Sequence, residues 1–583
     1  MNRQIRKVGI ALILCYVALF VQLNLVQVFR ADELNAHPDN SRAVQREFNR
    51  PRGDIVTADG VLLAETVDVE GKAFDVARRY PEGDLFAHTT GYLSFLYGAA
   101  GLERSYNAQL AGDTTEQQLR GLTDLFVDRP NVGDLHLSVR KDVQEVARDQ
   151  LGDREGSVVA LDPRTGQVLA FWSFPSYDPN PLASIDLDDD GAFTTATTTW
   201  DLLNIAPGKP LLAHQYQERY FPGSTFKPVT AGAGLAQGTV TATEPRYPVE
   251  RSWTPPLTTQ SISNFGGSAC GGDLLEILRV SCNTAFARMG VETVGPEGMI
   301  AGAEAWGFNR QPPIDLPDPA ESRFPTDFTR DLPKLAQASI GQNDVAATPL
   351  QMALVAAAVA NEGEMMRPTV VDEVRTPTGD VVDRNEPEVW NQPLERDQAL
   401  TLKEAMIGVV DGGTAAVLRT PGMEVGGKTG TAQLGTDPPS SHTWMIGFAG
   451  PPGDPQVAVA VVVLNQSGAR ESTGGAVAGP IAKAVIDKVL EVRAAEGLRR
   501  DPLAGAEGPT DPGAPSTTAA PATGGGGGPQ PAPAPPTTSA APEPVAPDPT
   551  TTVAPPESTV PEPPTTEAPT STTTTTADCG PPP

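Results

Sequence analysis

Three short motifs follow one another along the chain and contain residue types suited to nucleophilic chemistry. They are Ser224-Thr225-Phe226-Lys227, Ser281-Cys282-Asn283 and Lys428-Thr429-Gly430. A serine hydroxyl is a poor nucleophile until a base takes its proton, and a lysine can be that base once its pKa is lowered. The motifs therefore predict a nucleophile, a proton relay and an anion-binding site.

The first motif is expected at the start of a helix. Ser224 follows Pro222-Gly223 and precedes an alanine- and glycine-rich segment that we expect to be helical to about Gln237. Side chains three residues apart on a helix lie about 5 to 6 Å apart at Cβ, so Lys227 is within reach of the serine oxygen. Burial and a neighbouring cation such as Lys428 would lower its pKa from about 10.4. An isolated Ser-x-x-Lys is more often a helix cap beside an incidental lysine.

The second motif is expected in a loop between two helical segments, Leu274 to Val280 and Thr284 to Val291. Such a loop can present Ser281 and Asn283 to a cleft. Ser281 would pass a proton between the lysine and a leaving amine, and the Asn283 amide would hold a substrate amide as donor and acceptor. The alternative is that this Ser-x-Asn is an ordinary turn.

The third motif lies in a stretch of small residues, Gly426 to Gln433, that we expect to be an edge strand. Small residues allow a close backbone approach, so a peptide substrate could pair along this edge. Lys428 and Thr429 would attract its terminal carboxylate, and a backbone N–H would form half of an oxyanion hole. The alternative is a flexible glycine turn.

Two decoys show that each motif alone is a weak signal. Ser138-Val139-Arg140-Lys141 also fits Ser-x-x-Lys, and Ser105-Tyr106-Asn107 also fits Ser-x-Asn. We interpret Ser138 as the cap of a helix from Val139 to Leu151. The order of the three motifs and their flanking residues must therefore carry the functional argument.

The segments around the motifs predict an α+β fold. Ser157 to Leu161 and Gln167 to Trp172 flank a Pro-Arg-Thr-Gly turn and predict a hairpin. A second hairpin is expected from Thr443 to Leu464, and a helix from about Pro480 to Val492 follows it. Since alanine-rich helical segments lie between the hairpins, we expect an antiparallel sheet that is closed by both ends of the domain and flanked by helices.

The N-terminus predicts a membrane anchor. Arg3, Arg6 and Lys7 precede an uncharged segment, residues 8–29, which would span roughly 33 Å as a helix, enough for the hydrocarbon layer. The basic residues would keep residues 1–7 in the cytoplasm and everything after the anchor outside the membrane. A cleaved signal peptide is the alternative, although no small-x-small cleavage site follows Phe29.

The remaining chain divides into three predicted regions. Residues 30–155 would form an extended pedestal domain, residues 156–492 the catalytic domain, and residues 493–583 a disordered acidic tail rich in Pro, Thr, Ala and Gly. The net charge of -29 argues against nucleic acid as a partner. The 5 histidines are scattered and the 4 cysteines form no Cys-x-x-Cys pair, so we expect no metal site.

In their order and flanks, the motifs resemble those of the penicillin-binding proteins, serine acyltransferases that share a Ser-x-x-Lys, Ser-x-Asn and Lys-Thr-Gly set. The resemblance runs from about Arg50 to Val492. It is nearly letter for letter over two blocks, Pro222 to Lys227 and Gly427 to Ala432. Further blocks that resemble the family are Thr165-Gly166, Pro175 to Asn180, Thr348 to Ala353 and Gly413-Thr414-Ala415.

The chain is most similar to class B of that family. Arg52-Gly53-Asp54-Ile55 and the block from Gly101 to Tyr106 resemble class B pedestal motifs, and the region is too short for the glycosyltransferase module of class A. The short pedestal and the Ser-Cys-Asn variant are most like the penicillin-binding protein A group of actinobacteria. The resemblance implies a penicillin-binding/β-lactamase-like transpeptidase domain, a non-catalytic pedestal and one transmembrane helix.

The resemblance also implies a peptidoglycan D,D-transpeptidase that needs no cofactor. Ser224 would attack the D-Ala-D-Ala carbonyl of a stem peptide with Lys227 as base, and the acyl group would pass to an amine of a neighbouring stem. Ser281 and Lys428 would relay the proton to the leaving amine, and Asn283 would position the substrate. The residues expected to bind the substrate carboxylate region are Thr429, Gly430 and Thr431, and the backbone N–H groups of Ser224 and Thr431 would form the oxyanion hole.

Partners and rival functions follow from the same resemblance. It implies β-lactam binding, a membrane-embedded SEDS glycosyltransferase as partner, and roles in cell-wall synthesis, cell shape and division. A D,D-carboxypeptidase would give the same acyl-enzyme to water, and the motifs do not distinguish the acceptor. A β-lactamase is disfavoured because no Glu-x-x-Leu-Asn block follows Asn283. A non-catalytic division scaffold or β-lactam sensor is the rival from another class, although a sensor should have more than a seven-residue cytoplasmic head.

Cys282 is a departure from the family pattern. Cys270 lies twelve residues before it, in a compartment where disulfides can persist. We predict a disulfide between Cys270 and Cys282 that pins the loop carrying Ser281 and Asn283. Two free buried cysteines are the alternative.

Overall fold

The computed structural model describes residues 2–24, 48–70, 72–115, 117, 132–328, 331–467 and 473–497. The chain divides into two units, Met1–Gly505 and Ala506–Pro583, and every described residue belongs to the first. The end of the predicted anchor, the start of the predicted pedestal and the predicted tail from residue 498 onward lie outside the described residues.

A five-stranded antiparallel sheet organises the predicted catalytic region, in the order β17-β18-β19-β7-β8. Its strands are β7 (Gly156–Leu161), β8 (Val168–Phe174), β17 (Glu424–Gln433), β18 (Ser440–Gly450) and β19 (Val457–Ser467). β7 pairs with β19, so that Val159 lies opposite Ala460. The two predicted hairpins and the sheet closed by both ends of the domain are thus confirmed, and β17 is an edge strand of this sheet.

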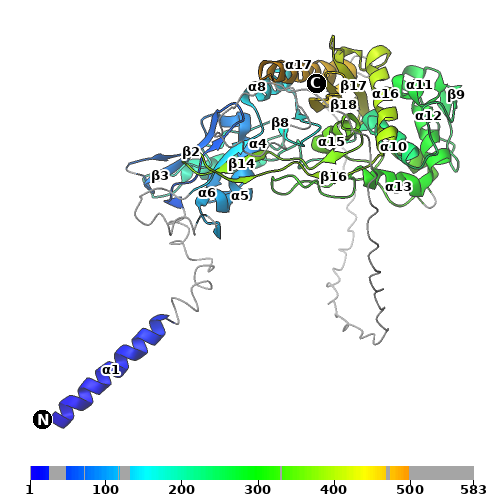
Figure 1. Cartoon of the computed structure of the whole chain (residues 1–583). Helices are drawn as coiled ribbons and strands as arrows, with labels where there is room; N and C mark the ends of the chain where they lie inside the picture. The colour runs from blue at the N-terminus through cyan, green and yellow to red at the C-terminus, as the bar shows by residue number, and fades with distance from the viewer. Residues whose placement is uncertain are drawn as a thin grey trace, which may run out of the picture. The chain divides into compact units, whose positions relative to one another are not determined.

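Helices cover both faces of this sheet, which is why β7, β8 and β19 are largely continuous apolar runs rather than alternating ones. On one face lie α8 (Lys141–Leu151) and α17 (Gly474–Ala495), which contact each other (Figure 1). Met445 of β18 points to α17, since its Cε lies 3.2 Å from the position of a Cβ on Gly479. On the other face lies α15 (Pro349–Ala360).

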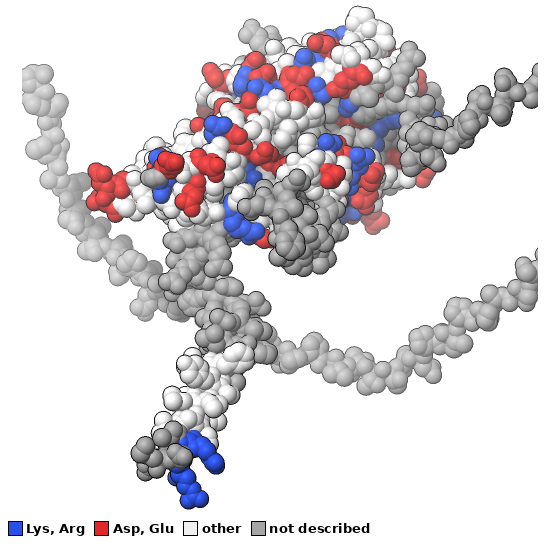
Figure 2. Space-filling model, turned by 60° about the vertical axis from the view of Figure 1, so that its left-hand side comes forward, with Lys and Arg blue, Asp and Glu red and all other residues white. Residues whose placement is uncertain are grey.

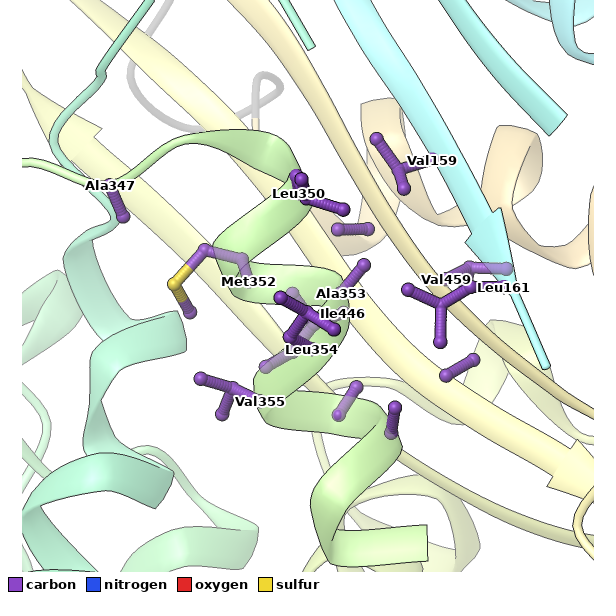
Figure 3. Close-up of a cluster of buried hydrophobic side chains, with 14 of the residues drawn as sticks. Val159, Leu161, Ala347, Leu350, Met352, Ala353, Leu354, Val355, Ile446 and Val459 are labelled. Carbon is purple, nitrogen blue, oxygen red and sulfur yellow. The ribbon is translucent and has the colours of Figure 1, made fainter. Parts of the chain in front are cut away.

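The helix α15 fills the space between the sheet and the catalytic helices. All of its residues are buried, and Figure 3 shows its Leu350 and Leu354 beside Val159, Val459 and Ile446 of the sheet. The Thr348 hydroxyl accepts a hydrogen bond from the backbone N–H of Gln351 and caps the helix. The Thr-Pro-Leu-Gln-Met-Ala block therefore encodes a capped, alanine-rich helix that can approach the sheet closely.

A second, six-stranded sheet lies in the predicted pedestal, in the order β15-β14-β6-β1-β2-β3. Its strands are β1 (Ile55–Val56), β2 (Leu62–Asp68), β3 (Val76–Arg79), β6 (Asp134–Leu137), β14 (Val371–Arg375) and β15 (Val381–Arg384). The Asp59-Gly60 turn joins β1 to β2, with Gly60 at φ 79°. Because β14 pairs with β6, two strands from inside residues 156–492 complete the pedestal sheet.

A buried ion cluster joins the two pedestal motifs. Glu103 is fully buried and accepts hydrogen bonds from Arg52 Nη2 at 3.0 Å and from Arg78 Nε at 2.5 Å. Burial alone would raise the pKa of Glu103, but Arg78 and Arg52 outweigh it, and the pKa is lowered. The family resemblance of these motifs therefore has a structural basis in a charge cluster that neither motif could satisfy alone.

The helical part of the catalytic region lies between the two hairpins in the chain. Its elements are η3 (Gly223–Phe226), α10 (Lys227–Ala236), α11 (Leu274–Arg279), α12 (Asn283–Arg288), η5 (Met289–Val294), α13 (Gly295–Ala305), α14 (Leu332–Ala338), α16 (Arg396–Gly412) and η6 (Ala416–Leu418). Other elements are η2 (Gly83–Phe86), α4 (Ala87–Thr90), β4 (Leu93–Ser94), β5 (Gly98–Ala99), α5 (Gly101–Ser105), α6 (Asn107–Ala111), α9 (Thr194–Ile205), η4 (Phe265–Gly267), β13 (Met365–Met366) and β16 (Val389–Asn391).

Two local predictions are wrong. The last helix begins at Gly474 rather than near Pro480, because the Thr473 side chain caps it and the proline lies inside it. Ser138 is not a helix cap: α8 begins at Lys141 with Arg140 as its N-cap residue. The Ser138 hydroxyl is buried and donates to the backbone oxygen of Val168 at 2.9 Å, because its segment continues the pedestal strand β6 into the catalytic region.

The N-terminal helix α1 (Asn2–Asn24) carries exposed apolar side chains such as Ile13 and Tyr16. Figure 2 shows basic residues only near its beginning, and along the body it shows acidic and basic residues interspersed on the visible face. Within the part of the chain that the structure describes, no helix has both the length and the apolar character needed to cross a membrane.

Candidate active site

Ser224 lies on η3, a single turn that runs directly into α10. Its predicted place in the first turn of a helical segment agrees with this arrangement. Gly223 has φ 53°, and a Cβ there would lie 3.0 Å from the Thr431 carbonyl oxygen. Glycine therefore suits this position both because of its left-handed backbone and because strand β17 lies against it.

Strand β17 approaches the serine turn closely at Gly430, which has no side chain of its own. A Cβ on Gly430 would lie 2.8 Å from the Pro222 carbonyl oxygen and 2.9 Å from Thr225 Cγ2. On the neighbouring strand, Trp444 Nε1 donates to the Phe221 carbonyl oxygen at 2.9 Å and holds the segment that leads to Ser224. The small residues of the third motif thus permit the close backbone approach that the sequence predicted.

Lys227 is fully buried at the start of α10. Its Nζ donates to Asn283 Oδ1 at 2.7 Å, to the Ser281 carbonyl oxygen at 2.7 Å and to Ser281 Oγ at 3.1 Å. Within the described residues, no hydrogen bond joins Lys227 Nζ to Ser224 Oγ. Burial, and then the charge of Lys428, lower the pKa of Lys227 well below its usual value.

Ser281 stands between two lysines. Lys428 Nζ donates to Ser281 Oγ at 2.8 Å and to the Thr429 carbonyl oxygen at 3.0 Å. Burial lowers the pKa of Lys428 to about 7. Because both lysines contact the same hydroxyl oxygen, the three side chains form a continuous path along which a proton can move between the first and third motifs.

The loop between α11 and α12 gives Ser281 its position. Ser281 has φ 57°, a left-handed conformation that is uncommon for a residue with a side chain. Its backbone N–H donates to the Leu278 carbonyl oxygen at 3.1 Å, and the N–H of Cys282 donates to that of Ile277 at 2.8 Å. These bonds close the end of α11 and turn the Ser281 hydroxyl toward the lysines.

A disulfide joins Cys282 to Cys270, the pair that the sequence analysis named. The two Cα atoms are 5.8 Å apart, and Cys270 begins β12 (Cys270–Gly272). Cys282 is buried directly between Ser281 and Asn283. The bond therefore ties the loop of the second motif to a strand outside the helical segment that carries it.

We expect a Cys270→Ala variant, which leaves the second motif unaltered, to lose about 2 to 3 kcal/mol of unfolding free energy, because the cross-link no longer restricts the unfolded chain. Thermal unfolding with and without dithiothreitol measures this. Reductant should lower the melting temperature of the unaltered protein but not that of the variant. A Cys15→Ala change at the exposed free cysteine is the matched control. Recovery of both cysteines as free thiols in non-reducing peptide mapping would contradict the prediction.

Asn283 uses both groups of its side-chain amide within the protein. Its Oδ1 accepts from Lys227, and its Nδ2 donates to the Ser263 carbonyl oxygen at 3.0 Å. A substrate amide would therefore compete with these two partners. Ser263 lies twenty residues before Asn283, and no motif in the sequence marks it as part of the site.

The hydroxyls proposed for substrate binding also have partners. Thr429 Oγ1 and Thr414 Oγ1 are 2.7 Å apart, and Thr431 Oγ1 accepts from the Gly474 N–H at 3.4 Å. Thr414 belongs to the Gly413-Thr414-Ala415 block, for which the sequence analysis named no role. The structure thus brings all three motifs to one place, and in the described part of the chain no group of His, Cys, Asp or Glu side chains could hold a metal ion.

Comparison with protein families matches residues 156–487 to the penicillin binding protein transpeptidase domain and residues 52–135 to the penicillin binding protein A dimerisation domain. The peptidoglycan D,D-transpeptidase PbpA of Mycolicibacterium smegmatis is 39% identical over 506 residues, which cover 84% of this chain and 99% of that protein. PbpA of Mycobacterium tuberculosis strain H37Rv is 36% identical over 509 residues, with the same two coverages.

Solved structures of penicillin-binding protein A also match this chain. Penicillin-binding protein A from M. tuberculosis, as an imipenem acyl-enzyme complex, matches with a TM-score of 0.68 at 36% identity, covering 76% of this chain and 99% of that one. Its penicillin G acyl-enzyme complex also has a TM-score of 0.68, at 36% identity, and covers 75% and 99%.

Proposed function

Because this chain belongs to the class B penicillin-binding proteins, we propose that Ser224 is the nucleophile through which it works as a peptidoglycan D,D-transpeptidase. The enzyme cross-links stem peptides by way of a serine acyl-enzyme and is a target of β-lactams. One observation carries the assignment of residues: a partly exposed serine lies one helical turn from a buried lysine that shares the Ser281 hydroxyl with a second buried lysine.

In the acylation step, neutral Lys227 would take the proton of Ser224 as its Oγ attacks the carbonyl carbon of D-Ala-D-Ala. The C–N bond to the terminal D-alanine then breaks, and the leaving amine receives a proton through Ser281 and Lys428. The lowered pKa of Lys227 supports its role as base, since a lysine of ordinary pKa would be protonated at neutral pH. The 2.8 Å contact between Lys428 and Ser281 supports the relay.

The substrate would extend along the edge of β17. Thr429, Gly430 and Thr431 would bind its carboxylate region, Asn283 would position its amide, and the backbone N–H groups of Ser224 and Thr431 would form the oxyanion hole. This arrangement is supported by the edge position of β17 and by the close approach of Gly430 to the serine turn. Lys428 would add positive charge beside the carboxylate.

The acyl group would then pass to an amine of a second stem peptide. Incubation with polymerised glycan carrying pentapeptide stems, followed by muramidase digestion and mass spectrometry, tests this. Cross-linked dimers that disappear in Ser224→Ala support transpeptidation. Free D-alanine and tetrapeptides without dimers would instead indicate a D,D-carboxypeptidase.

We further propose that residues 8–29 anchor the protein in the cell membrane, with residues 1–7 in the cytoplasm and the catalytic domain outside. The basic head and the exposed apolar side chains of α1 support this orientation. Cell fractionation tests it. The full chain should require detergent for extraction, and a chain without residues 2–29 should not. Extraction of both by alkaline carbonate would contradict an integral anchor.

The pedestal would bind a partner protein of this enzyme. We propose residues 30–155 as this non-catalytic domain, residues 156–492 as the transpeptidase domain, and a membrane SEDS glycosyltransferase as the protein that supplies glycan strands. The match of residues 52–135 to a dimerisation domain supports a role in association. Copurification from detergent extracts tests the partnership, with a chain lacking the pedestal as control. Equal recovery of the polymerase with both chains would contradict it.

A further inference from the structure

Residues 247–272 form a small lobe beside the second motif. It contains two strand pairs, β9 (Tyr247–Glu250) with β12 and β10 (Ser252–Trp253) with β11 (Ile262–Ser263). The lobe packs on α12, whose Arg288 lies 5.0 Å from the ring centroid of Trp253 and 3.1 Å from Glu250 Oε1. The helix that begins with the proposed catalytic amide, Asn283, is thus held from one side by this lobe.

Asn264 is the polar residue at the centre of this contact, and only 5% of the residue is exposed. Its Oδ1 accepts from the backbone N–H of Thr284 at 3.0 Å. Its Nδ2 donates to the carbonyl oxygens of Glu250 at 2.8 Å and Ser268 at 3.1 Å. Only a side-chain amide offers an acceptor to α12 and two donors to the lobe at once.

The residue before Asn264 makes the next contact. The Ser263 carbonyl oxygen accepts from Asn283 Nδ2 at 3.0 Å. With Nδ2 bound in this way, the Asn283 amide presents its Oδ1 to Lys227 Nζ at 2.7 Å. Two adjacent residues of the lobe therefore hold two adjacent residues of α12, and the second of these contacts sets which end of the Asn283 amide faces the lysine.

We propose that Asn264 is a positioning residue for the transpeptidase reaction, which fixes the Ser263 carbonyl and the start of α12 so that Asn283 directs its oxygen to Lys227. This inference rests on the proposed function of Ser224 and Lys227. Asn264 itself touches neither the serine nor the lysines. It differs from the disulfide, which holds Cys282, because it controls the orientation of the amide that follows.

The reaction's pH dependence separates positioning from simple support of the fold. The Asn283 oxygen accepts from the charged form of Lys227 and so favours protonation of this lysine. If Asn283 turns away, the ammonium loses that acceptor and the pKa of Lys227 falls further. Among the described residues, the charged group acting on Lys227 is Lys428 on β17. The groups of α12 next to Nζ are uncharged: the Asn283 amide at 2.7 Å and the Phe286 ring, whose centroid is 5.6 Å away. The acid limb of acylation should therefore move to lower pH.

The test measures the second-order rate of acylation by a fluorescent penicillin from pH 5 to pH 9, using the full chain in detergent. Asn264→Leu removes all three hydrogen bonds and keeps the number and branching of the side-chain heavy atoms, and Asn264→Ala removes them without added bulk. Asn180→Leu is the matched control, since Asn180 bonds both the N–H and the carbonyl oxygen of Tyr80 at 2.9 Å, far along the chain from the motifs. Circular dichroism checks that each variant is folded.

Both Asn264 variants are expected to lose at least tenfold in acylation rate at neutral pH, with the acid limb displaced by about half a pH unit to lower pH. Asn180→Leu should keep the unaltered limb. An unaltered acylation rate in the folded Asn264 variants would overturn the inference. So would a loss of rate that Asn180→Leu also shows, if the acid limb of the pH profile stays in place. If the leucine variant does not fold, the alanine variant decides by the same criteria. Failure of the unaltered protein to acylate would instead refute the proposed function.

Discussion

A Ser224→Ala variant is expected to show no covalent labelling by a fluorescent penicillin and to lose at least about 10⁴-fold in transpeptidation rate. The acyl-enzyme is an ester of the serine oxygen, so it cannot form once that oxygen is absent. In another serine hydrolase, removal of the nucleophile costs about 10⁶-fold. Gel fluorescence after incubation with the penicillin measures labelling directly.

The chain supplies its own matched control for this experiment. Ser138 lies in the other Ser-x-x-Lys sequence, but its hydroxyl is buried and donates to the backbone oxygen of Val168. Ser138→Ala should therefore keep its labelling and lose at most a modest amount of stability, about 1 kcal/mol for one hydrogen bond. Labelling that survives Ser224→Ala would refute the assignment of the nucleophile.

A Lys227→Met variant is expected to acylate about 10³-fold more slowly, within the range that a positioned general base usually contributes. Methionine has nearly the length of lysine but cannot accept the serine proton. The variant also leaves Ser281 Oγ and Asn283 Oδ1 without their shared donor. Stopped-flow acylation by a chromogenic cephalosporin measures the rate. Lys141→Met, at the lysine of the decoy motif, should leave it unchanged, and an equal loss in both variants would contradict the role of Lys227.

The pH dependence of acylation tests the role of Lys227 as base, because the direction in which the acid limb moves can be predicted. The base must be neutral, so the rate should rise as the pH increases through the lowered pKa of Lys227. Removing the positive charge at Lys428 should raise that pKa again, because one of its two causes disappears. A Lys428→Met variant should therefore show its acid limb at higher pH than the unaltered protein. An acid limb that stays in place would contradict electrostatic coupling between the two lysines.

Much of the fold followed from local patterns. The two hairpins were predicted from short apolar runs that flank turn residues, and their pairing followed because they lie at opposite ends of one domain. The edge position of β17 was predicted from its small residues. The start of α17 was not predicted because a proline is a strong local sign of a helix start. The cap is instead the Thr473 side chain, which accepts from a backbone N–H three residues later.

Contacts between distant segments escaped the sequence analysis. Ser138 has the spacing of a cap, but its partners belong to segments that lie 30 and more than 200 residues later in the chain. Strands β14 and β15 join the pedestal sheet although they lie inside residues 156–492. Asn264 and Ser263 carry no motif at all. Each of these residues makes hydrogen bonds to or from backbone groups. Because nearly every residue has the same backbone groups, the residue type of the partner does not reveal such a contact.

The sequence alone predicts the groups that carry the chemistry of this protein: Ser, Lys, Ser, Asn and Lys in that order along the chain, within flanks typical of one enzyme family. The tertiary structure decided how those groups act on one another. Burial lowers the pKa values of both lysines, and the charge of Lys428 lowers that of Lys227 further. Both lysines contact the Ser281 hydroxyl, at 3.1 Å and 2.8 Å, and the contacts of Ser263 and Asn264 orient the Asn283 amide. The physical reason is that side-chain types follow from the sequence, whereas solvation and hydrogen-bond geometry arise only when segments remote in the chain are packed together.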